Sequence, residues 1–467
     1  MKPLRLLIAL AVLVGLGGAV WYSEKHPPQP KSDTKTEKII AVEQDQLKRI
    51  RIARPAETVT LEKADDGKWR ITEPKAYKAD ESTASSLVSS LASLNADQVV
   101  AEKNSDWKTY GLEPGNIRVE VGLKDGKTLK LALGDDAPTS SGVYARLEGN
   151  DRLFTIGSYV KSSIDKPAAD LRDKKLLPFD SEKTSRVTIV TKERTLEFGK
   201  AGTAWQIVKP KPLRADNSAV DDVVRSVRDA SFESILFEGK TESEKPPAKY
   251  SFASPYAAFE AVDAGGVHTL TVGKEGKDKD VTYYAKSTAM PGVFKLASSV
   301  AEGLNKKLDD LRNKKLFDFG WSDPQKLEVR DGEVRLLIEK QKDKDNKDKW
   351  VLSSAGNREL PSDKVQSLID NLRNLSSKAF TADDAPVQAK YGLSKPVAQA
   401  KVTSDEGKRV EQVLLASGPE SKYFAARENE PATYEIEKTA YEDFQKAIRE
   451  LKDAPPPLPE KKADKKK

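Results

Sequence analysis

The sequence predicts an α+β protein of three tandem homologous modules, each a mainly antiparallel sheet with two helices, after an N-terminal transmembrane helix. Three observations predict this. Four landmarks recur in constant order, with one of them at positions 144, 284 and 424, a spacing of 140 residues. Strand-like alternation dominates each copy, and a charge-free apolar run lies at the N-terminus.

Residues 1–22 are the predicted membrane anchor. Lys2 and Arg5 precede Leu6–Tyr22, a segment without a charged residue. This run is short for a membrane span, but flanking polar side chains can extend it. The leading basic residues place everything after the span on the far side of the membrane. A cleaved signal peptide, processed near Gly17–Ala19, is the alternative.

Polar segments lie at both ends of the folded part. Residues 23–37 are predicted to be a tether, because they are rich in Pro, Lys and Ser. Residues 454–467 combine a proline run with a lysine-rich end and predict a disordered tail.

The first landmark is a tryptophan in an alternating segment, found at Trp69, Trp205 and Trp350. Alternating polarity predicts a strand with one buried face, and Asp65-Asp66-Gly67 predicts a hairpin turn before the first of these strands. Because all three copies keep the indole, we expect it to be a buried wedge on the sheet.

A long helix is predicted after each tryptophan strand. Asp80 and Asp216 can accept a hydrogen bond from a first-turn backbone amide, and Pro361-Ser362-Asp363 is the counterpart in the third copy. Apolar residues then recur with helical spacing. In the first copy these are Leu87, Leu91 and Leu94.

The other three landmarks are a turn, an aromatic–alanine pair and a basic exit segment. The turns are Tyr110-Gly111-Leu112, Tyr250-Ser251-Phe252 and Tyr391-Gly392-Leu393. The pairs are Tyr144-Ala145, Tyr284-Ala285 and Phe424-Ala425. The exits are Leu171–Leu176, Leu311–Leu316 and a weaker third version at Ile448–Lys452.

The repeat spacing matches the size of one domain rather than that of a solenoid unit. The predicted domains are therefore residues 38–180, 181–320 and 321–453. Because most strands follow one another along the chain, we expect antiparallel sheets with the helices on one face.

The ordered set of landmarks resembles the domain of unknown function 4340. The resemblance covers most of residues 38–453 and is better in the first copy than in the third. It implies no assigned activity. It implies a bacterial, membrane-anchored protein that is often encoded beside ABC-type export systems related to gliding motility.

The search for catalytic chemistry gives no candidate residue. The chain has no cysteine, which removes disulfides, thiolate zinc sites and cysteine nucleophiles. Of its two histidines, His26 lies in the tether and His268 in an alternating strand. No nucleophile elbow, HExxH helix or P-loop occurs. The prediction is no catalytic, cofactor-binding or metal-binding residue, and no enzyme activity.

Two weaker signals have simple interpretations. Asp343–Asp348 resembles a calcium loop, but it lacks the required glycine and the bidentate glutamate, so a solvated hairpin turn is favoured. The 79 basic and 73 acidic residues are interspersed and leave a net charge of +6, which does not favour nucleic-acid binding.

The expected function is that of a non-catalytic binding or scaffold protein. It would be anchored in the bacterial inner membrane by a single helix, with the bulk of the chain in the periplasm. A protein partner is expected, and the family resemblance implies ABC-transporter subunits. The alternative is a hydrolase with a carboxylate site in one divergent repeat, which would show as an acidic cleft that the other repeats lack.

Overall fold

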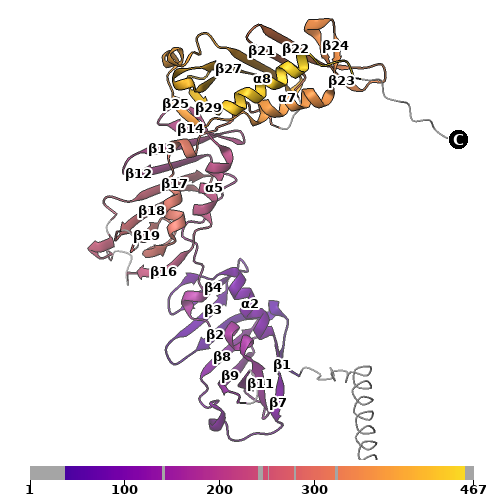
Figure 1. Cartoon of the computed structure of the whole chain (residues 1–467). Helices are drawn as coiled ribbons and strands as arrows, with labels where there is room; N and C mark the ends of the chain where they lie inside the picture. Colours follow the sequence, from indigo (N-terminus) through magenta and orange to yellow (C-terminus); the bar gives the residue numbers. More distant parts are fainter. Residues whose placement is uncertain are drawn as a thin grey trace, which may run out of the picture. The chain divides into compact units, whose positions relative to one another are not determined.

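Figure 1 shows the computed structural model, which describes residues 37–457 except 139–141, 240–243, 245, 251, 278–279 and 321–323. The chain forms two compact units that divide between Lys174 and Lys175. The first unit contains one nine-stranded antiparallel sheet and the second contains two. The predicted α+β class with three antiparallel sheets is confirmed.

The predicted anchor of residues 1–22 lies outside the described residues, as does almost all of the tether and the end of the tail. Among the described residues, no helix has the length and apolarity that a membrane crossing requires.

The first sheet has the strand order β5-β4-β3-β2-β8-β9-β10-β11-β7. Its strands, in chain order, are β2 (Leu47–Ala53), β3 (Thr58–Lys63), β4 (Trp69–Glu73), β5 (Tyr77–Lys78), β7 (Gln98–Ala101), β8 (Ile117–Leu123), β9 (Thr128–Asp136), β10 (Gly142–Leu147) and β11 (Leu153–Gly157). A separate two-stranded sheet pairs β1 (Lys38–Ala41) with β6 (Ser93–Asn95).

The second and third sheets repeat this order. The second consists of β12 (Arg186–Thr191), β13 (Thr195–Ala201), β14 (Ala204–Lys209), β15 (Leu213–Arg214), β16 (Phe232–Phe237), β17 (Ala257–Asp263), β18 (Gly266–Glu275), β19 (Thr282–Ser287) and β20 (Val293–Leu296). The third consists of β21 (Lys326–Asp331), β22 (Val334–Lys342), β23 (Asp348–Leu352), β24 (Arg358–Leu360), β25 (Ala379–Ala382), β26 (Ala398–Ser404), β27 (Arg409–Ser417), β28 (Tyr423–Arg427) and β29 (Thr433–Ile436).

One long helix follows the fourth strand of each sheet: α2 (Glu81–Ala92), α5 (Asn217–Arg228) and α7 (Ser362–Asn374). The predicted caps are present in the first two. An oxygen of Asp80 accepts the Thr83 amide at 2.8 Å, and one of Asp216 accepts the Ala219 amide at 3.1 Å. Pro361 occupies the cap position of α7 and supplies no side-chain hydrogen bond.

A second helix follows the ninth and last strand of each sheet in chain order: α3 (Ser158–Ile164), α6 (Ser298–Gly303) and α8 (Lys438–Lys452). The first repeat departs from the prediction of two helices, because it also contains the four-residue α4 (Ala168–Leu171). In the second repeat the corresponding turn is a 3₁₀ helix, η4 (Leu308–Asp310). The extra helix is therefore one turn that closes with α-helical rather than 3₁₀ hydrogen bonds.

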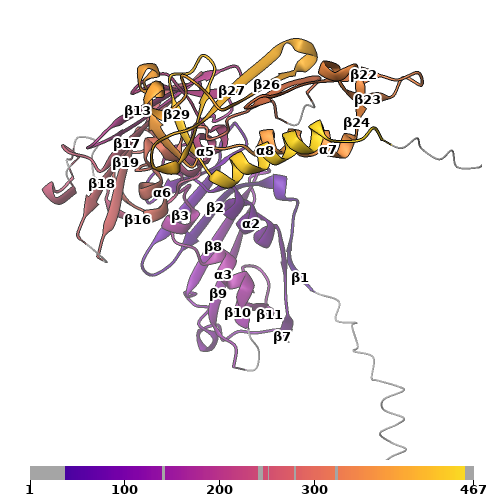
Figure 2. The same ribbon diagram turned by 45° about the horizontal axis from the view of Figure 1, so that its top comes forward.

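The main core of each repeat lies between these helices and one face of the sheet. In the second repeat, Val223 and Val227 of α5 join Phe198 and Phe259 of the sheet in one buried cluster. Figure 2 shows α7 and α8 side by side along the third sheet, and both contribute buried residues to its core. Helical spacing on α5 and alternation in the strands thus produce the two halves of the same core.

The three tryptophans occupy the same strand of their sheets, β4, β14 and β23. Trp205 and Trp350 are buried, with 2% and 7% of their surface exposed, and both belong to their main cores. Trp69 is only half-buried and packs at the edge of its core. The predicted buried wedge is thus confirmed for the second and third repeats and is incomplete in the first.

On the opposite face of each sheet, the turn landmark meets the aromatic landmark. The Tyr110 and Tyr144 rings lie 4.8 Å apart, Tyr250 and Tyr284 lie 5.3 Å apart, and Tyr391 and Phe424 lie 4.6 Å apart. Edge-to-face pairs at such distances are favourable. Each repeat therefore has a small second core, and the loss of the hydroxyl at Phe424 does not disturb this packing.

Gly134 in β9 gives a test of this second core. A β-carbon at this position would overlap the carbonyl oxygen of Tyr110 and crowd Leu112. We expect Gly134→Ala to lower the free energy of unfolding of the first repeat by about 1–3 kcal/mol. Gly303→Ala is the matched control, because a β-carbon there meets no atom within 4 Å. Equal effects of the two substitutions in urea denaturation would contradict the prediction.

Candidate functional site

Histidine and cysteine, two of the side chains that most often bind metals or act in catalysis, are nearly absent: the chain has two histidines and no cysteine. No group of three or more His, Asp or Glu side chains within the described ranges is placed to hold a metal ion. His26 lies outside these ranges, and His268 lies in β18. The remaining candidates are buried charges, cavities and contacts between repeats.

His268 connects the sheet to the segment that leads into the second repeat. Its Nε2 lies 2.9 Å from Oδ1 of Asp263, and its ring stacks on Phe179 with centroids 5.9 Å apart. The other oxygen of Asp263 accepts the backbone amide of Asp180 at 2.9 Å. Within the described structure, no serine hydroxyl hydrogen-bonds to the imidazole. The contacts of His268 with Asp263 and Phe179 are those of a residue that stabilises the fold.

The hydrogen bond from the Asp180 amide, with that from His268, lowers the pKa of Asp263 from 3.8 to about 2. A carboxylate whose pKa is lower in the folded state stabilises the fold above its unfolded pKa. This stabilisation should be lost as pH falls from about 4 through about 2.

We expect Asp263→Ala to destabilise the second repeat by about 1–3 kcal/mol at neutral pH, because two amides and an imidazole lose their acceptor. The free energy of unfolding of the variant should also fall less steeply below pH 4 than that of the wild type, as measured by circular dichroism in acid titrations. A wild-type acid profile in Asp263→Ala would contradict this assignment.

Glu411 occupies the position of His268 in the third repeat, as the sheet registers show. Its carboxylate accepts the amide of Asp318 at 3.0 Å and lies 3.0 Å from Nη2 of Arg427. Arg409 approaches it at 3.4 Å. The best-buried carboxylate of this divergent repeat is thus neutralised by two arginines, which does not favour it as the general acid or base of a hydrolase.

The acidic segment Asp343–Asp348 forms the turn between β22 and β23. Oδ1 of Asp343 accepts the amides of Asp345 and Lys347, each at 2.8 Å. The carboxylate that would begin a calcium loop therefore stabilises its own hairpin turn, as predicted.

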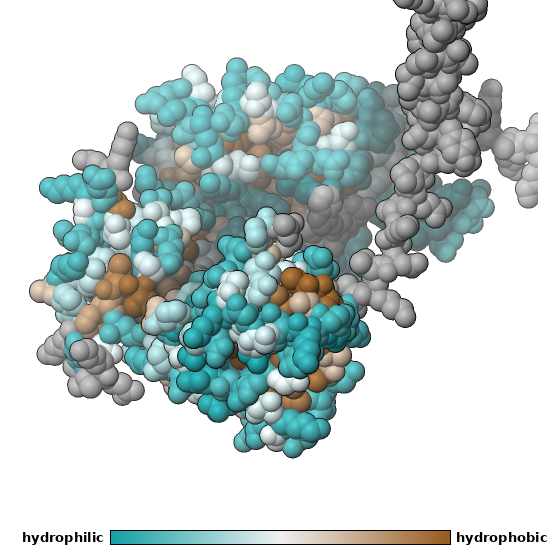
Figure 3. Space-filling view, turned by 90° about the horizontal axis from the view of Figure 1, so that it is seen from below, coloured by the Kyte–Doolittle hydropathy of each residue, from teal (hydrophilic) through white to brown (hydrophobic). Residues whose placement is uncertain are grey.

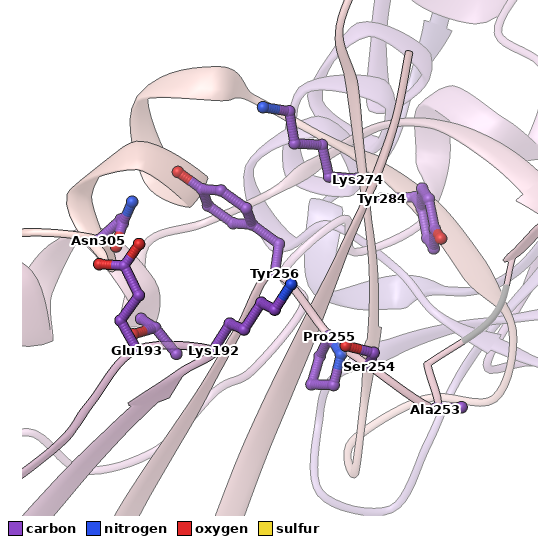
Figure 4. Close-up of a pocket in the computed structure, with 10 residues that line it drawn as sticks. Lys192, Glu193, Ala253, Ser254, Pro255, Tyr256, Lys274, Tyr284 and Asn305 are labelled. Atoms are coloured by element: carbon purple, nitrogen blue, oxygen red, sulfur yellow. The ribbon is translucent and has the colours of Figure 1, made fainter. Parts of the chain in front are cut away.

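Figure 4 shows a cavity of about 530 Å³ in the second repeat, at the end of the β12–β13 hairpin. The side chains of Glu193, Asn305 and Tyr256 border its open space, and Lys192 reaches toward it from the hairpin. Most of these groups are exposed. The cavity has a mixed lining of polar and apolar side chains.

A cluster of buried and half-buried charges lies at the joint between the second and third repeats, both of which belong to the second unit. The exit segment Leu311–Leu316 is hydrogen-bonded to both repeats. The carbonyl of Leu311 accepts the Asp216 amide at 2.9 Å, and the amide of Leu316 donates to Leu375 at 2.9 Å. Backbone hydrogen bonds therefore hold both ends of this short segment, one end to each repeat.

Arg312 is the central side chain of this joint, with 3% of its surface exposed. Its two terminal nitrogens lie 2.7 and 3.3 Å from the two oxygens of Asp383. Its guanidinium also stacks 3.7 Å above the Phe380 ring. Planar stacking and a two-point ion pair are contacts that suit arginine better than lysine.

Two further ion pairs cross the joint with the same polarity. Lys211 lies 3.2 Å from Asp383, and Nε of Arg214 lies 2.9 Å from Glu430. Among these pairs the second repeat contributes the cations and the third contributes the anions. A cavity of about 380 Å³ remains between them, bordered by Arg214, Arg312 and Glu430. The joint can fix the two repeats and carries no group arranged for bond making.

The last residue of each of the first two exit segments, with the residue after it, completes the core of the next repeat. Leu176 and Leu177 lie in the core of the second repeat, and Leu316 and Phe317 in that of the third. The domain ranges drawn from the sequence assign these residues to the preceding repeat. Their placement follows from backbone pairing of each segment with residues after the long helix, at Ala230 and Leu375.

Sequence reasoning identified the exit segment as a landmark but not as a joint. The repeated pattern Leu-Arg-x-Lys-Lys-Leu was visible at 171–176 and 311–316. A basic residue between two buried leucines in that pattern is the signal that could have indicated a buried arginine. Asp383, its partner, has no sequence feature that marks it.

Comparisons with known proteins give one informative match. The family model described as "Domain of unknown function (DUF4340)" matches residues 69–247, 205–349 and 350–454. No curated protein matches the chain. A DNA polymerase sliding clamp from Pseudomonas aeruginosa is 9% identical over 85% of this chain and 93% of its own. Its TM-score of 0.14 is too low to support an argument.

The three matched segments follow the three repeats seen in the sequence and the three sheets of identical strand order. The prediction of tandem copies is therefore confirmed, and the chain belongs to the family of the domain of unknown function DUF4340.

Proposed function

We propose that this chain is a non-catalytic scaffold, anchored by residues 1–22 in the bacterial inner membrane, with residues 38–453 in the periplasm. Its repeats would present sheet faces to a protein partner. ABC-transporter subunits are the partner class that the family resemblance implies.

One observation carries the proposal: what the three repeats keep in common is packing. The retained tryptophans, the aromatic pairs and the exit leucines all fill cores or hold neighbouring segments. In the second unit, the buried Arg312 and Glu411 are each paired with an opposite charge. This pattern supports a protein that positions partners rather than one that transforms a substrate.

The N-terminal sequence supports the location. Lys2 and Arg5 before a charge-free run favour retention of the N-terminus in the cytoplasm. Mass spectrometry of the N-terminus of the mature protein distinguishes the anchor from the cleaved signal peptide. The anchor predicts a chain that retains residues 6–22 and stays in the membrane fraction after a carbonate wash.

The partner is tested by crosslinking in intact cells, followed by purification of the full chain from solubilised membranes. The proposal expects a defined membrane complex that contains at least one other protein. The transporter hypothesis further expects its subunits to co-purify only when residues 1–22 are present. Recovery of the chain without any crosslinked protein in repeated experiments would refute the scaffold function.

A further inference from the structure

The segment that enters the first repeat pairs with it in the way that the exit segment Leu311–Leu316 pairs with the third repeat. The amide of Ala96 donates to the carbonyl of Glu37 at 2.7 Å, and the amide of Ser377 donates to the carbonyl of Lys314 at 2.7 Å. The antiparallel pairing of the next residues agrees. Glu37 therefore occupies the place in the first repeat that Lys314 occupies in the third.

The edge strand beside this segment is also equivalent in the two repeats. Ala101 ends β7 and Ala382 ends β25. The sheet registers place both alanines at the same point, directly after a register shift. The next residue is acidic in each case, Glu102 in the first repeat and Asp383 in the third. The two carboxylates thus stand at equivalent ends of an edge strand.

The third repeat shows what this carboxylate binds. Asp383 pairs at 2.7 Å with Arg312, which lies two residues before Lys314. The residue two positions before Glu37 is Lys35, which lies outside the described residues. The entry segment therefore has a cation at the sequence position where the exit segment has one.

Glu102 is exposed and only weakly paired. Its side chain is 79% exposed and lies 3.9 Å from Nη1 of Arg152. The same nitrogen forms a closer pair with Glu37, so two carboxylates share one cation and favour the approach of another. Val100, on the same strand, is 41% exposed. Figure 3, in which the first unit is nearest the viewer, shows apolar side chains among the polar ones on the surface of this unit.

We propose that residues 34–36 dock on this edge of the first sheet, with Lys35 paired to Glu102 as Arg312 is paired to Asp383. The occupant is a segment of the chain itself, because the backbone hydrogen bond of Glu37 fixes the chain beside the edge. Two residues span at most about 7 Å, so the backbone of Lys35 stays close to this point.

The side chains at the edge suit a lysine. Val99 occupies in β7 the position that Phe380 occupies in β25. The phenylalanine stacks against the guanidinium of Arg312, whereas a valine can contact the aliphatic stem of a lysine whose ammonium reaches the carboxylate. The ion pair is thus kept while the stacking contact is replaced.

This contact goes beyond the scaffold function proposed above, because it fixes where the tether leaves the fold. Only residues 23–33 would then connect the predicted anchor to the first repeat, and they span at most about 40 Å. If the anchor is retained, the β7 edge would lie within that distance of the membrane. The contact itself does not require the anchor, because cleavage near Gly17–Ala19 would leave Lys35 in the chain.

Carbodiimide coupling tests the contact, because it joins an amine to a carboxylate only where the two groups touch. The full chain in detergent is treated and digested, and mass spectrometry identifies the coupled peptides. We expect a product that joins Lys35 to Glu102. The pair of Lys211 and Asp383, 3.2 Å apart, is the positive control in the same molecule. Lys31, in the same entry segment, is the matched control and should not couple to Glu102.

Hydrogen exchange of the Ala96 amide gives a second readout, since this amide is bonded to the entry segment. Lys35→Glu and Glu102→Lys should each raise its exchange rate about two- to fivefold, because like charges then meet at the edge. The two substitutions together restore an attractive pair and should return the rate to that of the wild type. Lys31→Glu makes the same charge change outside the contact and should leave the rate unchanged.

Three results would overturn the proposal. One is the absence of a product between Lys35 and Glu102 in a sample where Lys211 couples to Asp383. Another is equal coupling of Lys31 and Lys35 to Glu102. The third is a double variant in which the effects of the two single substitutions add, since the side chains would then not interact. None of these results depends on recovery of a partner, so this contact and the scaffold function can fail separately.

Discussion

Replacing Arg312 with alanine is expected to lower the free energy of unfolding of the second unit by about 3 kcal/mol. The substitution removes a buried guanidinium that is paired with Asp383 at 2.7 Å and stacked on Phe380. It leaves the Asp383 carboxylate, 18% exposed, with Lys211 as its remaining cation. Loss of one partner of a buried pair costs more than the pair contributes, because the other charge stays desolvated.

The measurement is hydrogen–deuterium exchange, which reports local opening segment by segment. Protection should fall in β25 and in the amides that the exit segment holds, including that of Asp216. Arg312→Lys should recover only part of the loss, because an ammonium forms no two-point pair.

Arg225→Ala is the control for removal of an arginine. Its pair with Asp222 is exposed on both sides, so the expected change is within about 0.5 kcal/mol. An Arg312→Ala chain with wild-type exchange at β25 would show that the joint does not depend on this residue.

The joint explains how the chain passes between repeats without a linker. Four backbone hydrogen bonds and the Arg312 pair hold Leu311–Leu316 to the repeats on either side. The cations lie on one side of the joint and the anions on the other, so salt should weaken its exposed pairs first. Under the scaffold function proposed above, such a joint would keep partner-binding surfaces on the two repeats at a fixed separation.

Local patterns predicted the elements well. The Asp80 cap, the hairpin turn before Trp69 and the spacing of Leu87 and Leu91 each depend on residues close in sequence. Leu94, predicted on the same helix, lies instead in the strand β6, because the helix ends at Ala92. The antiparallel pairing of consecutive strands was also accessible, since sequential hairpins are the simplest antiparallel arrangement. The pairing of β2 with β8 and of β11 with β7 was not predicted. Three copies of each pattern made the prediction stronger than any single copy could.

Contacts between distant residues were not predictable in the same way. Arg312 and Asp383 are 71 residues apart, and neither position has a periodic pattern that points to the other. The meeting of Tyr110 with Tyr144 was likewise hidden, although both were landmarks. Trp69 is half-buried whereas Trp205 is buried, because the residues around them differ. The presence of a tryptophan in every repeat could not indicate this difference.

Phe317→Ala is expected to have the other large effect, a loss of about 3–5 kcal/mol of unfolding free energy in the third repeat. In sequence, Phe317 lies in the stretch between two repeats. In the structure it is 1% exposed and belongs to the core of the third repeat with Leu316 and Phe319. Truncation would leave a cavity beneath the helices α7 and α8, and a rigid core recovers little of that volume.

The segments in which hydrogen exchange accelerates show whether Phe317 stabilises the third repeat or the second. If Phe317 completes the third repeat, hydrogen exchange should accelerate in α7, α8 and β26, while α5 and the strands of the second repeat keep their protection. Tyr159→Ala removes an aromatic ring that is 76% exposed, so it should change stability by no more than about 0.5 kcal/mol. If exchange accelerates in the second repeat instead, Phe317 stabilises that repeat. The boundary between the second and third repeats would then lie after Phe317.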